Sequence, residues 1–228
     1  GKTLSNVDTL SVINEGDYVL SDGTTVVWAG NLSGGVAGAD APWHYNVAGI
    51  GRDDGSGLYQ KIGKSINNDA AMTVALDNDF TTANSDSARL GTFSADKQWI
   101  MWGTNGGSKY FDTAVSTTNT NTRQGLVYKM KFTGAGFTTK SVNIKFGNDN
   151  VMRLKNGQNY VLLESATADM ATPTELATSA AVASGMTSSV TFAGVTITDG
   201  KFYSLATKMI APGGVTTKLI NGLKVSTF

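Results

Sequence analysis

The stretch LVYKMKF, residues 126–132, places an apolar side chain at every second position. Because successive side chains of a strand point to opposite faces, its apolar residues share one face. These residues are Leu126, Tyr128, Met130 and Phe132. The pattern predicts a strand with one buried face and predicts that Lys129 and Lys131 point to water. A second alternating stretch, SVNIKF at residues 141–146, follows a glycine-containing turn, so residues 125–146 are predicted to form a β-hairpin.

Short stretches of this kind recur along the chain, which contains 27 glycines and only 3 prolines. They are DYVL, TTVVWA, AMTVAL, NYVLLES, SVTFAGVTI and KFYSLAT. QWIMW, residues 98–102, is apolar on both faces and is predicted to be a central strand covered on each side. The best helix candidate, Thr172–Gly185, fits a long ordered loop equally well. We therefore predict an all-β protein, an antiparallel β-sandwich of jelly-roll or immunoglobulin-like topology with little helix.

The length of 228 residues is enough for one large all-β domain or two small domains. The chain contains no Pro/Ser-rich linker and no block of like charges. We therefore predict a single sandwich domain over residues 1–228, with residues 1–16 and 213–228 as strand appendages. No apolar stretch approaches the length of a membrane span. No signal peptide is visible, which is expected of a cytosolic protein, a mature form or an excised domain.

The charge balance excludes some classes of partner. The chain carries 18 basic and 18 acidic residues, and charged residues make up only 16% of it. A nucleic-acid-binding protein is expected to carry a basic stripe, so we expect no nucleic-acid partner. The sequence contains no cysteine, which excludes disulfides, thiolate metal sites and cysteine nucleophiles.

Residues suited to catalysis are few. The single histidine, His44, would have to serve any Ser-His-Asp triad, but no G-x-S-x-G elbow precedes a helix. One histidine without cysteine cannot build a usual zinc site. Glu164, in YVLLESA, is the only acid within an apolar strand, whereas glycoside hydrolysis requires a pair of carboxylates. We therefore predict no catalytic residues.

A charged corner, defined as Arg52, Asp53, Asp54 and Gly55, lies between two glycine clusters. We interpret it as a structural turn that joins the strand NVAGI to the strand LYQKIGKSI. One aspartate is expected to pair with Arg52, and the other to accept backbone N–H bonds within the turn. On this interpretation the corner fastens the scaffold and performs no reaction.

Calcium is the metal that the other acids could bind, because it prefers six to eight hard oxygen ligands. The candidate ligands are Asp77, Asp79 and Asp149. None of them lies in an EF-hand loop pattern, and aspartate and asparagine also favour turns that hold no ion. Calcium therefore stays an open alternative, and no other cofactor is indicated.

The aromatic residues suggest a ligand surface, because sugars stack on exposed rings. Trp43, His44 and Tyr45 lie in the loop-like stretch APWHYN and are candidate ligand-binding residues for a glycan or a peptide. Of the three, Trp43 is the best candidate for an exposed ring. The two tryptophans of QWIMW are assigned to the core instead.

Several segments occur in an order that resembles a known family. They are YNVAGIGRDDGSGLYQ, FSADKQWIMWGTNGG, GLVYKMKF, YVLLES and TDGKFYSLAT. Their order resembles an uncharacterised β-rich module of large secreted bacterial surface proteins, which often lies beside laminin-G-like or concanavalin-like domains in adhesin-like chains. The resemblance spans roughly residues 17–212, and GIGRDDGSGL is its most specific part. It implies an exported, non-catalytic surface module, and it supplies no ligand and no catalytic residues.

Three function classes are compatible with these features. The first is a non-enzymatic structural or adhesive protein of the bacterial cell surface, which associates with itself or with neighbouring surface domains. Self-assembly into a fibre would add the final strand, residues 216–228, to a sheet of another copy through Leu219, Leu223, Val225 and Phe228. Alternatively, this strand folds back on its own domain. The second class is a calcium-assisted module that binds a glycan or peptide, and the third is a hydrolase with two converging acids.

Overall fold

Antiparallel strands make up the structure, a computed structural model that describes residues 17–30, 37–67, 70–84, 89–115, 122–147, 158–179, 189–209, 217–220 and 223–226. In these ranges every strand pair is antiparallel. The only helical elements described are two short 3-10 turns, η1 (Ala41–Trp43) and η2 (Asp54–Ser56). The prediction of an all-β, antiparallel protein with little helix is therefore confirmed. No described helix is long and apolar enough to cross a bilayer.

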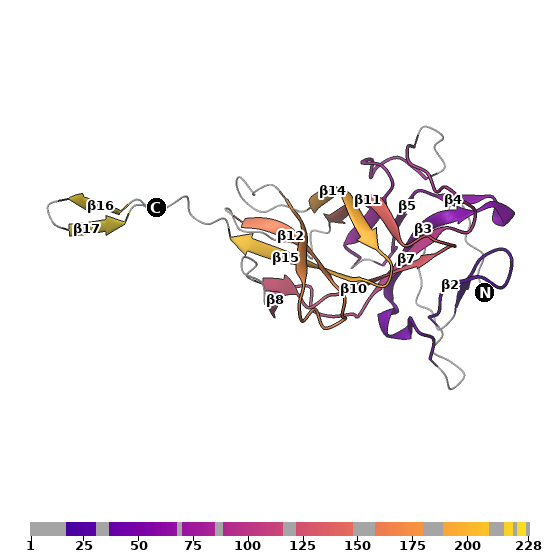
Figure 1. Ribbon diagram of the computed structural model, residues 1–228, viewed down its shortest axis with the longest axis horizontal. Helices are drawn as coiled ribbons and strands as arrows, with labels where there is room; N and C mark the ends of the chain where they lie inside the picture. The colour runs from indigo at the N-terminus through magenta and orange to yellow at the C-terminus, as the bar shows by residue number, and fades with distance from the viewer. Residues whose placement is uncertain are drawn as a thin grey trace.

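Two large sheets contain most of the described strands (Figure 1). The larger sheet has nine strands, and its main path runs β13-β12-β15-β10-β7-β3-β4, with β9 beside β15 and β8 beside β9. The smaller sheet has four strands in the order β14-β11-β6-β5. The strands of the larger sheet are β3 (Tyr45–Asp53), β4 (Leu58–Gln60), β7 (Trp99–Thr104), β8 (Phe111–Ala114), β9 (Thr122–Gln124), β10 (Tyr128–Thr133), β12 (Gln158–Ser165), β13 (Thr174–Thr178) and β15 (Phe202–Met209). Those of the smaller sheet are β5 (Ile62–Lys64), β6 (Met72–Ala75), β11 (Thr139–Gly147) and β14 (Ser189–Thr198).

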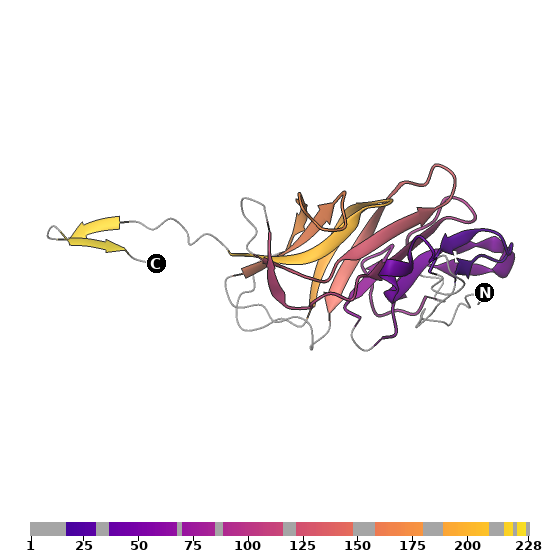
Figure 2. The ribbon, with the colours of Figure 1, turned by 90° about the horizontal axis from the view of Figure 1, so that it is seen from below.

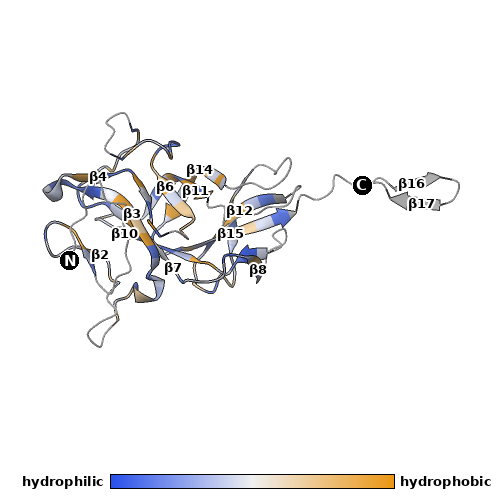
Figure 3. Ribbon diagram, turned by 180° about the vertical axis from the view of Figure 1, so that it is seen from behind, coloured by the Kyte–Doolittle hydropathy of each residue, from blue (hydrophilic) through white to orange (hydrophobic). Residues whose placement is uncertain are grey.

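The main core lies between these two sheets. Tyr128 and Met130 of the larger sheet pack in one apolar cluster with Ile144 and Phe146 of the smaller sheet. The rings of Tyr128 and Phe146 meet edge to face, with their centroids 5.8 Å apart. Hydrophobic and hydrophilic positions alternate as orange and blue along the strands in Figure 3. The sheets therefore pack in a sandwich-like arrangement because each has an apolar face to bury.

A second core lies on the other face of the larger sheet. The N-terminal strap, defined as residues 17–30 and 37–43, contains β1 (Tyr18–Val19), β2 (Val26–Trp28) and η1. It is indigo in Figure 2 and lies at the end of the body that holds β3 and β4. Trp28 and Trp43 of the strap pack in one cluster with Trp99 and Met101 of β7. Ile100 and Trp102 of β7 belong to the main core instead, so the predicted central strand with two covered faces is confirmed.

The predicted hairpin over residues 125–146 is wrong, although both of its strands exist. β10 pairs with β7 and β15 in the larger sheet, whereas β11 pairs with β6 and β14 in the smaller sheet. The connection therefore crosses from one sheet to the other. Alternation shows which face of each strand is buried, but two strands with one apolar face each can lie side by side or stack face to face. Stacking covers both apolar faces at once.

Two further expectations differ from the structure. The helix candidate Thr172–Gly185 contains β13, an edge strand that pairs with β12 over residues 174–178. Pairing along β12 outweighs the weak helix preference of the alanine-containing segment. The expected strand LYQKIGKSI is two strands, because the chain bends at Lys61 and passes from β4 in the larger sheet to β5 in the smaller one.

The last described strands form a hairpin of their own. β16 (Thr217–Ile220) pairs with β17 (Leu223–Ser226), with Ile220 opposite Leu223 and Lys218 opposite Val225. Figure 2 draws this C-terminal hairpin as a separate two-stranded sheet. Instead of the single strand expected within residues 213–228, the segment thus contains two. Residues 1–16, the other expected appendage, lie outside the described residues.

Candidate functional site

The charged corner joins β3 to β4 through η2. The guanidinium of Arg52 binds the carboxylate of Asp54 with two hydrogen bonds, from Nε at 2.7 Å and from Nη2 at 2.8 Å. The backbone N–H of Asp54 donates to the Asp96 carboxylate at 2.7 Å. Gly57 ends the turn with a φ of 67°, a conformation that glycine adopts without strain. Arg52 and Asp54 are both partly exposed, at 32% and 52% of their side chains, and they hold the outside of the turn.

Asp53 occupies the inside of the corner, where it is only 2% exposed. Its carboxylate accepts three hydrogen bonds, from the Ser21 N–H at 2.9 Å, the Ser21 hydroxyl at 2.6 Å and the Ser56 hydroxyl at 2.8 Å. Burial alone would raise the pKa of Asp53, but these hydrogen bonds outweigh it and hold the pKa below its ordinary value. Ser21 lies between β1 and β2, so Asp53 attaches the N-terminal strap to the larger sheet.

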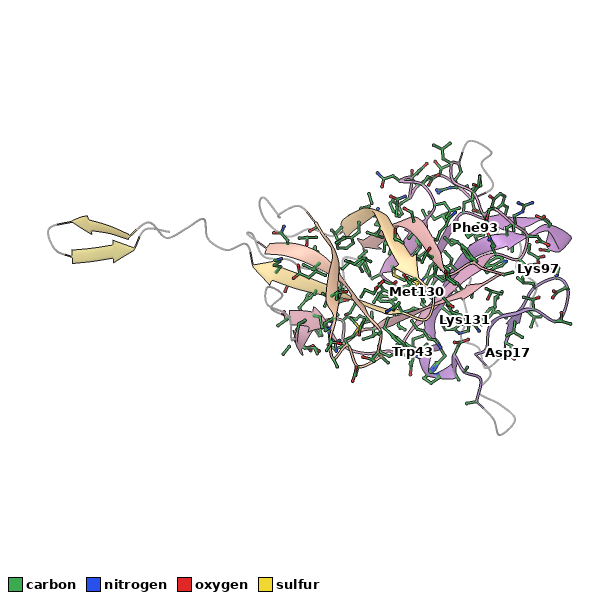
Figure 4. All side chains as sticks on the ribbon, viewed as in Figure 1. Asp17, Trp43, Phe93, Lys97, Met130 and Lys131 are labelled. Carbon is green, nitrogen blue, oxygen red and sulfur yellow. The ribbon has the colours of Figure 1, made fainter. Side chains whose placement is uncertain are left out.

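Asp40 makes a second attachment between the strap and the sheet. Its carboxylate is 1% exposed and accepts hydrogen bonds from Lys129 Nζ at 2.6 Å, Lys131 Nζ at 2.7 Å and the Ala29 N–H at 2.8 Å. Burial acts to raise the pKa of Asp40, and the two lysines and the N–H outweigh it and lower the pKa. The prediction that Lys129 and Lys131 point to water is therefore wrong. Lys129 and Lys131 do alternate with the buried residues of β10, and Figure 4 shows Lys131 and Met130 on this strand, but the strap covers the side of the lysines.

The expected calcium ligands lie in a loop that surrounds an internal cation, the guanidinium of Arg89. Arg89 Nη1 donates to the Asp77 carboxylate at 2.6 Å, and Nη2 donates to the backbone carbonyls of Asp79 and Thr82 at 2.6 Å and 2.8 Å. The Arg89 side chain is fully buried. Asp79 accepts the N–H groups of Thr81 and Thr82 instead of facing Asp77. In the part of the chain that the structure describes, no three His, Cys, Asp or Glu residues cluster as a metal site, and Asp149 lies outside that part.

The predicted aromatic surface is only partly exposed. Trp43 is 9% exposed and packs against Phe202, with ring centroids 5.1 Å apart, so its prediction as the best exposed ring is wrong. The 3-10 turn η1 directs it into the second core, where its apolar area is buried. Tyr45 is 49% exposed and its ring lies 4.0 Å from that of His44. A Cβ on Gly106 would lie 2.6 Å from Cε2 of Tyr45, so the tyrosine ring rests on the backbone there.

Glu164 has a structural partner. The buried hydroxyl of Tyr203 donates to Glu164 Oε2 at 2.7 Å and accepts the Thr198 N–H at 2.9 Å. Burial, with a further contribution from Glu164, raises the pKa of Tyr203 above its ordinary value. The hydroxyl therefore keeps its proton and links β12 and β15 to the end of β14.

Of the four residues expected to dock in another copy, Leu219 lies in β16, and Leu223 and Val225 lie in β17. Phe228 is outside the described residues. The positions of the other three along the hairpin are set by its register, in which Leu219 stands opposite Lys224.

A family model described as a domain of unknown function, DUF8202, matches residues 2–201. The chain belongs to this family. No curated protein and no solved structure matches the chain. A domain of unknown function thus covers most of the chain, and its described part is all-β.

The DUF8202 match ends one residue before β15 begins. β15 nevertheless lies between β12 and β10 in the larger sheet, and its residues Tyr203, Leu205 and Ala206 are fully buried. The folded sheet of this family member therefore continues at least to Met209.

The sequence did not predict the roles of Asp40, Ser21 and Arg89. Asp40 and Ser21 take part in the contacts that attach the strap, and Arg89 binds the loop that contains Asp77 and Asp79. Asp40 and Lys129 are 89 positions apart, and no local pattern links them. Arg89 could have been suspected, since a basic residue close to an acidic, turn-rich stretch can take the place of a metal ion.

Proposed function

We propose that this DUF8202 domain is a non-enzymatic structural or adhesive module of an extracellular bacterial surface protein. The observation that carries the proposal is that four of its buried or half-buried acids bind groups within the chain. Asp40 and Asp53 attach the strap, Asp77 binds Arg89, and Glu164 binds Tyr203. Each of these carboxylates is directed at a group of its own chain.

Acid–base catalysis needs a group that faces substrate and has a pKa near the working pH. The two buried acids that attach the strap, Asp40 and Asp53, have lowered pKa values, because hydrogen bonds stabilise their charged forms. His44 places Nδ1 2.8 Å from the carbonyl oxygen of Ala41, so Nδ1 carries a proton and the ring is oriented by backbone. These arrangements support a scaffold role rather than turnover.

Surface location is tested on intact cells of the organism that carries the gene. Antibodies raised against the folded domain are used for immunogold labelling, before and after brief protease treatment of whole cells. We expect labelling at the cell surface that protease removes, while an antibody against a cytoplasmic protein labels only permeabilised cells. Labelling confined to permeabilised cells would contradict the proposal.

A fibre subunit is the form of this function that the C-terminal hairpin favours. In the part of the chain that the structure describes, β16 and β17 pair only with each other. A two-stranded hairpin alone is marginal in water, so the sheet of another copy would stabilise it. Head-to-tail addition of this kind produces an open fibre.

Deletion of residues 216–228 tests the fibre. Wild-type protein is expected to form polymers in negative-stain images and a concentration-dependent mass in size-exclusion chromatography with light scattering, and the deleted protein is expected to stay monomeric. Unchanged polymers after the deletion, or a wild-type monomer at all concentrations, would remove the fibre candidate.

A further inference from the structure

The outer face of the smaller sheet is positively charged, and we infer that it binds an acidic polysaccharide. The four strands of this sheet contain three lysines and no acidic residue, although the whole chain has as many acidic as basic residues. The inference rests on the adhesive role proposed above and names the class of ligand. The ligand is a sugar chain that carries carboxylate or sulfate groups.

A row of four side chains, one from each strand, crosses this face. Thr73 of β6 stands opposite both Lys64 of β5 and Lys145 of β11. Lys145 in turn stands opposite Thr191 of β14. Directly opposed residues of antiparallel strands point to the same face of a sheet, with their Cβ atoms about 5 Å apart. These four residues form the lysine–threonine row, in which one threonine separates the two lysines.

The lysine–threonine row points away from the main core. Ile144, the neighbour of Lys145 on β11, and Val74, the neighbour of Thr73 on β6, are fully buried between the two sheets. Because successive side chains of a strand alternate between faces, the row lies on the opposite, outer face of the smaller sheet. Thr191 is exposed and the other three members are half-buried.

The positive charge of the row is not neutralised by the chain itself. In the part of the chain that the structure describes, neither lysine of the row pairs with a carboxylate. The larger sheet differs, because Lys129 and Lys131 share Asp40, and Lys208 pairs with Glu175. The row therefore presents two ammonium groups to an anion outside the chain.

The loop after β6 adds an aromatic ring beside this charge. Nζ of Lys145 lies 5.8 Å from the ring centroid of Phe80, which is half-buried. The two aspartates of the loop bind groups of the loop itself. Asp77 accepts a hydrogen bond from Arg89, and Asp79 accepts two backbone N–H groups. Their carboxylates are thus directed away from the row.

The chemistry of the outer face suits an acidic sugar chain. Ser141 and Thr196 stand opposite each other on this face, and both are exposed, so hydroxyl groups continue beyond the row. Hydroxyls both donate to and accept from the hydroxyls of a sugar, and ammonium groups make charge-assisted hydrogen bonds to its acidic substituents. A nucleic-acid site would instead combine a basic stripe with several rings for base stacking.

Binding of the full-length protein to soluble polymers tests the inference. The probes are polygalacturonate, which carries carboxylates, chondroitin sulfate, which also carries sulfates, and two comparison polymers, neutral dextran and single-stranded DNA. Microscale thermophoresis measures each affinity at about 50 mM and about 300 mM NaCl, since salt screens the attraction between exposed charges. We expect an acidic polysaccharide to bind at low salt and more weakly at high salt, and dextran not to bind. Tighter binding of DNA than of either acidic polysaccharide would overturn the assignment.

Substitutions within the row locate the site. Lys64→Gln/Lys145→Gln removes both charges, and Lys145→Gln removes one. Thr191→Glu keeps both lysines but places a carboxylate opposite Lys145. Lys201→Gln is the matched control for the single charge, because Lys201 is also a half-buried lysine without a carboxylate partner among the described residues, and it lies between β14 and β15. Circular dichroism and thermal unfolding confirm that each variant is folded.

We expect each lost lysine of the row to weaken binding about threefold, and the double variant to weaken it about 10-fold, as for exposed ion pairs. Thr191→Glu should also weaken binding, and Lys201→Gln should bind like the wild type. Unchanged binding in the double variant, or an equal loss in Lys201→Gln, would overturn the site. If the domain is labelled on the cell surface but binds no acidic polysaccharide, the ligand is wrong and the surface role stands. Labelling confined to permeabilised cells would overturn the surface role on which the inference rests.

Discussion

Asp40 shows how one buried carboxylate can hold a whole segment in place. It is the shared partner of Lys129 and Lys131, and it also accepts the Ala29 N–H. The two lysines are 18% and 26% exposed, whereas Asp40 is 1% exposed. Loss of the carboxylate therefore leaves two half-buried cations without their counter-charge.

We expect Asp40→Asn to lower the free energy of unfolding by about 3 kcal/mol, because breaking a buried ion pair leaves unpaired charge. Urea unfolding monitored by circular dichroism measures the change. The matched control is Glu175→Gln, which breaks the more exposed pair with Lys208 and should cost less than about 1 kcal/mol. Equal losses in the two variants would show that Asp40 is not a special attachment.

Arg89 gives a second prediction at this scale, because its guanidinium occupies the position that a calcium ion could have taken. Arg89→Met is expected to destabilise the fold by about 3 kcal/mol, since it removes the positive charge that pairs with the Asp77 carboxylate and the donor that two backbone carbonyls share. Arg89→Lys keeps the charge but not the planar fork, so it should lose less. Thermal unfolding provides the comparison.

The same experiment includes a metal test. Millimolar calcium or a chelator should leave the wild-type Tm unchanged, because the loop oxygens already bind Arg89. A calcium-dependent rise of several degrees in the wild type would contradict this account, since a ligand that binds only the folded state raises its stability.

The candidate residues were predictable only where their partners are close in sequence. Arg52 and Asp54 are two positions apart, and pairing within the turn follows from the local sequence. Asp53 binds Ser21 of the strap, which lies 32 positions earlier in the chain, and no pattern in either segment predicts this contact. Burial of Trp43 likewise depends on Phe202, which lies in β15, the last strand of the larger sheet in chain order.

At the scale of elements, β15 is the strand on which the larger sheet depends. It pairs with β12 on one side and with β10 and β9 on the other. A chain that stops at residue 201, where the family match ends, lacks this strand. Its neighbours would then expose buried residues such as Leu162 and Tyr160.

We expect a chain truncated after residue 209 to unfold cooperatively with a Tm close to that of the wild type, and a chain truncated after residue 201 to be unfolded or aggregated. The two truncated chains differ by β15 alone, so each serves as the control for the other. Circular dichroism and size-exclusion chromatography distinguish the outcomes. A folded chain of 201 residues would show that the larger sheet forms without β15.

Alternating patterns predicted most strands because they report the burial of faces directly. They predicted β7 well, since a strand that is apolar on both faces has to be covered twice. They could not predict that β10 and β11 belong to different sheets, because pairing partners are chosen by contacts distant in sequence. For the same reason the sequence indicates a helix or an ordered loop where β13 lies, since pairing with β12, and not the residues of β13 themselves, decides its structure.

At the scale of the whole molecule, the acids make stability depend on pH. The pKa values of Asp22, Asp40, Asp53 and Asp79 are all lowered in the folded state. In the unfolded chain, aspartate has a pKa of about 3.9. Because the folded-state pKa values are lower, the unfolded chain binds more protons in acid than the folded chain does. The stability that these groups supply is therefore complete above about pH 5 and is lost as the pH falls below about 4.

We expect the urea midpoint to be similar at pH 7 and pH 5 and clearly lower at pH 3. The double variant Asp40→Asn/Asp53→Asn should be less stable at neutral pH and show a smaller drop between pH 5 and pH 3. If the double variant loses as much stability between pH 5 and pH 3 as the wild type does, groups other than Asp40 and Asp53 cause the acid sensitivity.

The position of β15 also has a consequence for the order in which the chain can fold. Its residues, 202–209, are the last of the larger sheet in chain order, yet the strand lies inside the sheet instead of at its margin. Strands β10 and β12 both pair with β15, so these two pairings cannot form until residues 202–209 have been synthesised. The larger sheet of a chain that grows from its N-terminus is therefore joined across β15 only after its other strands are present.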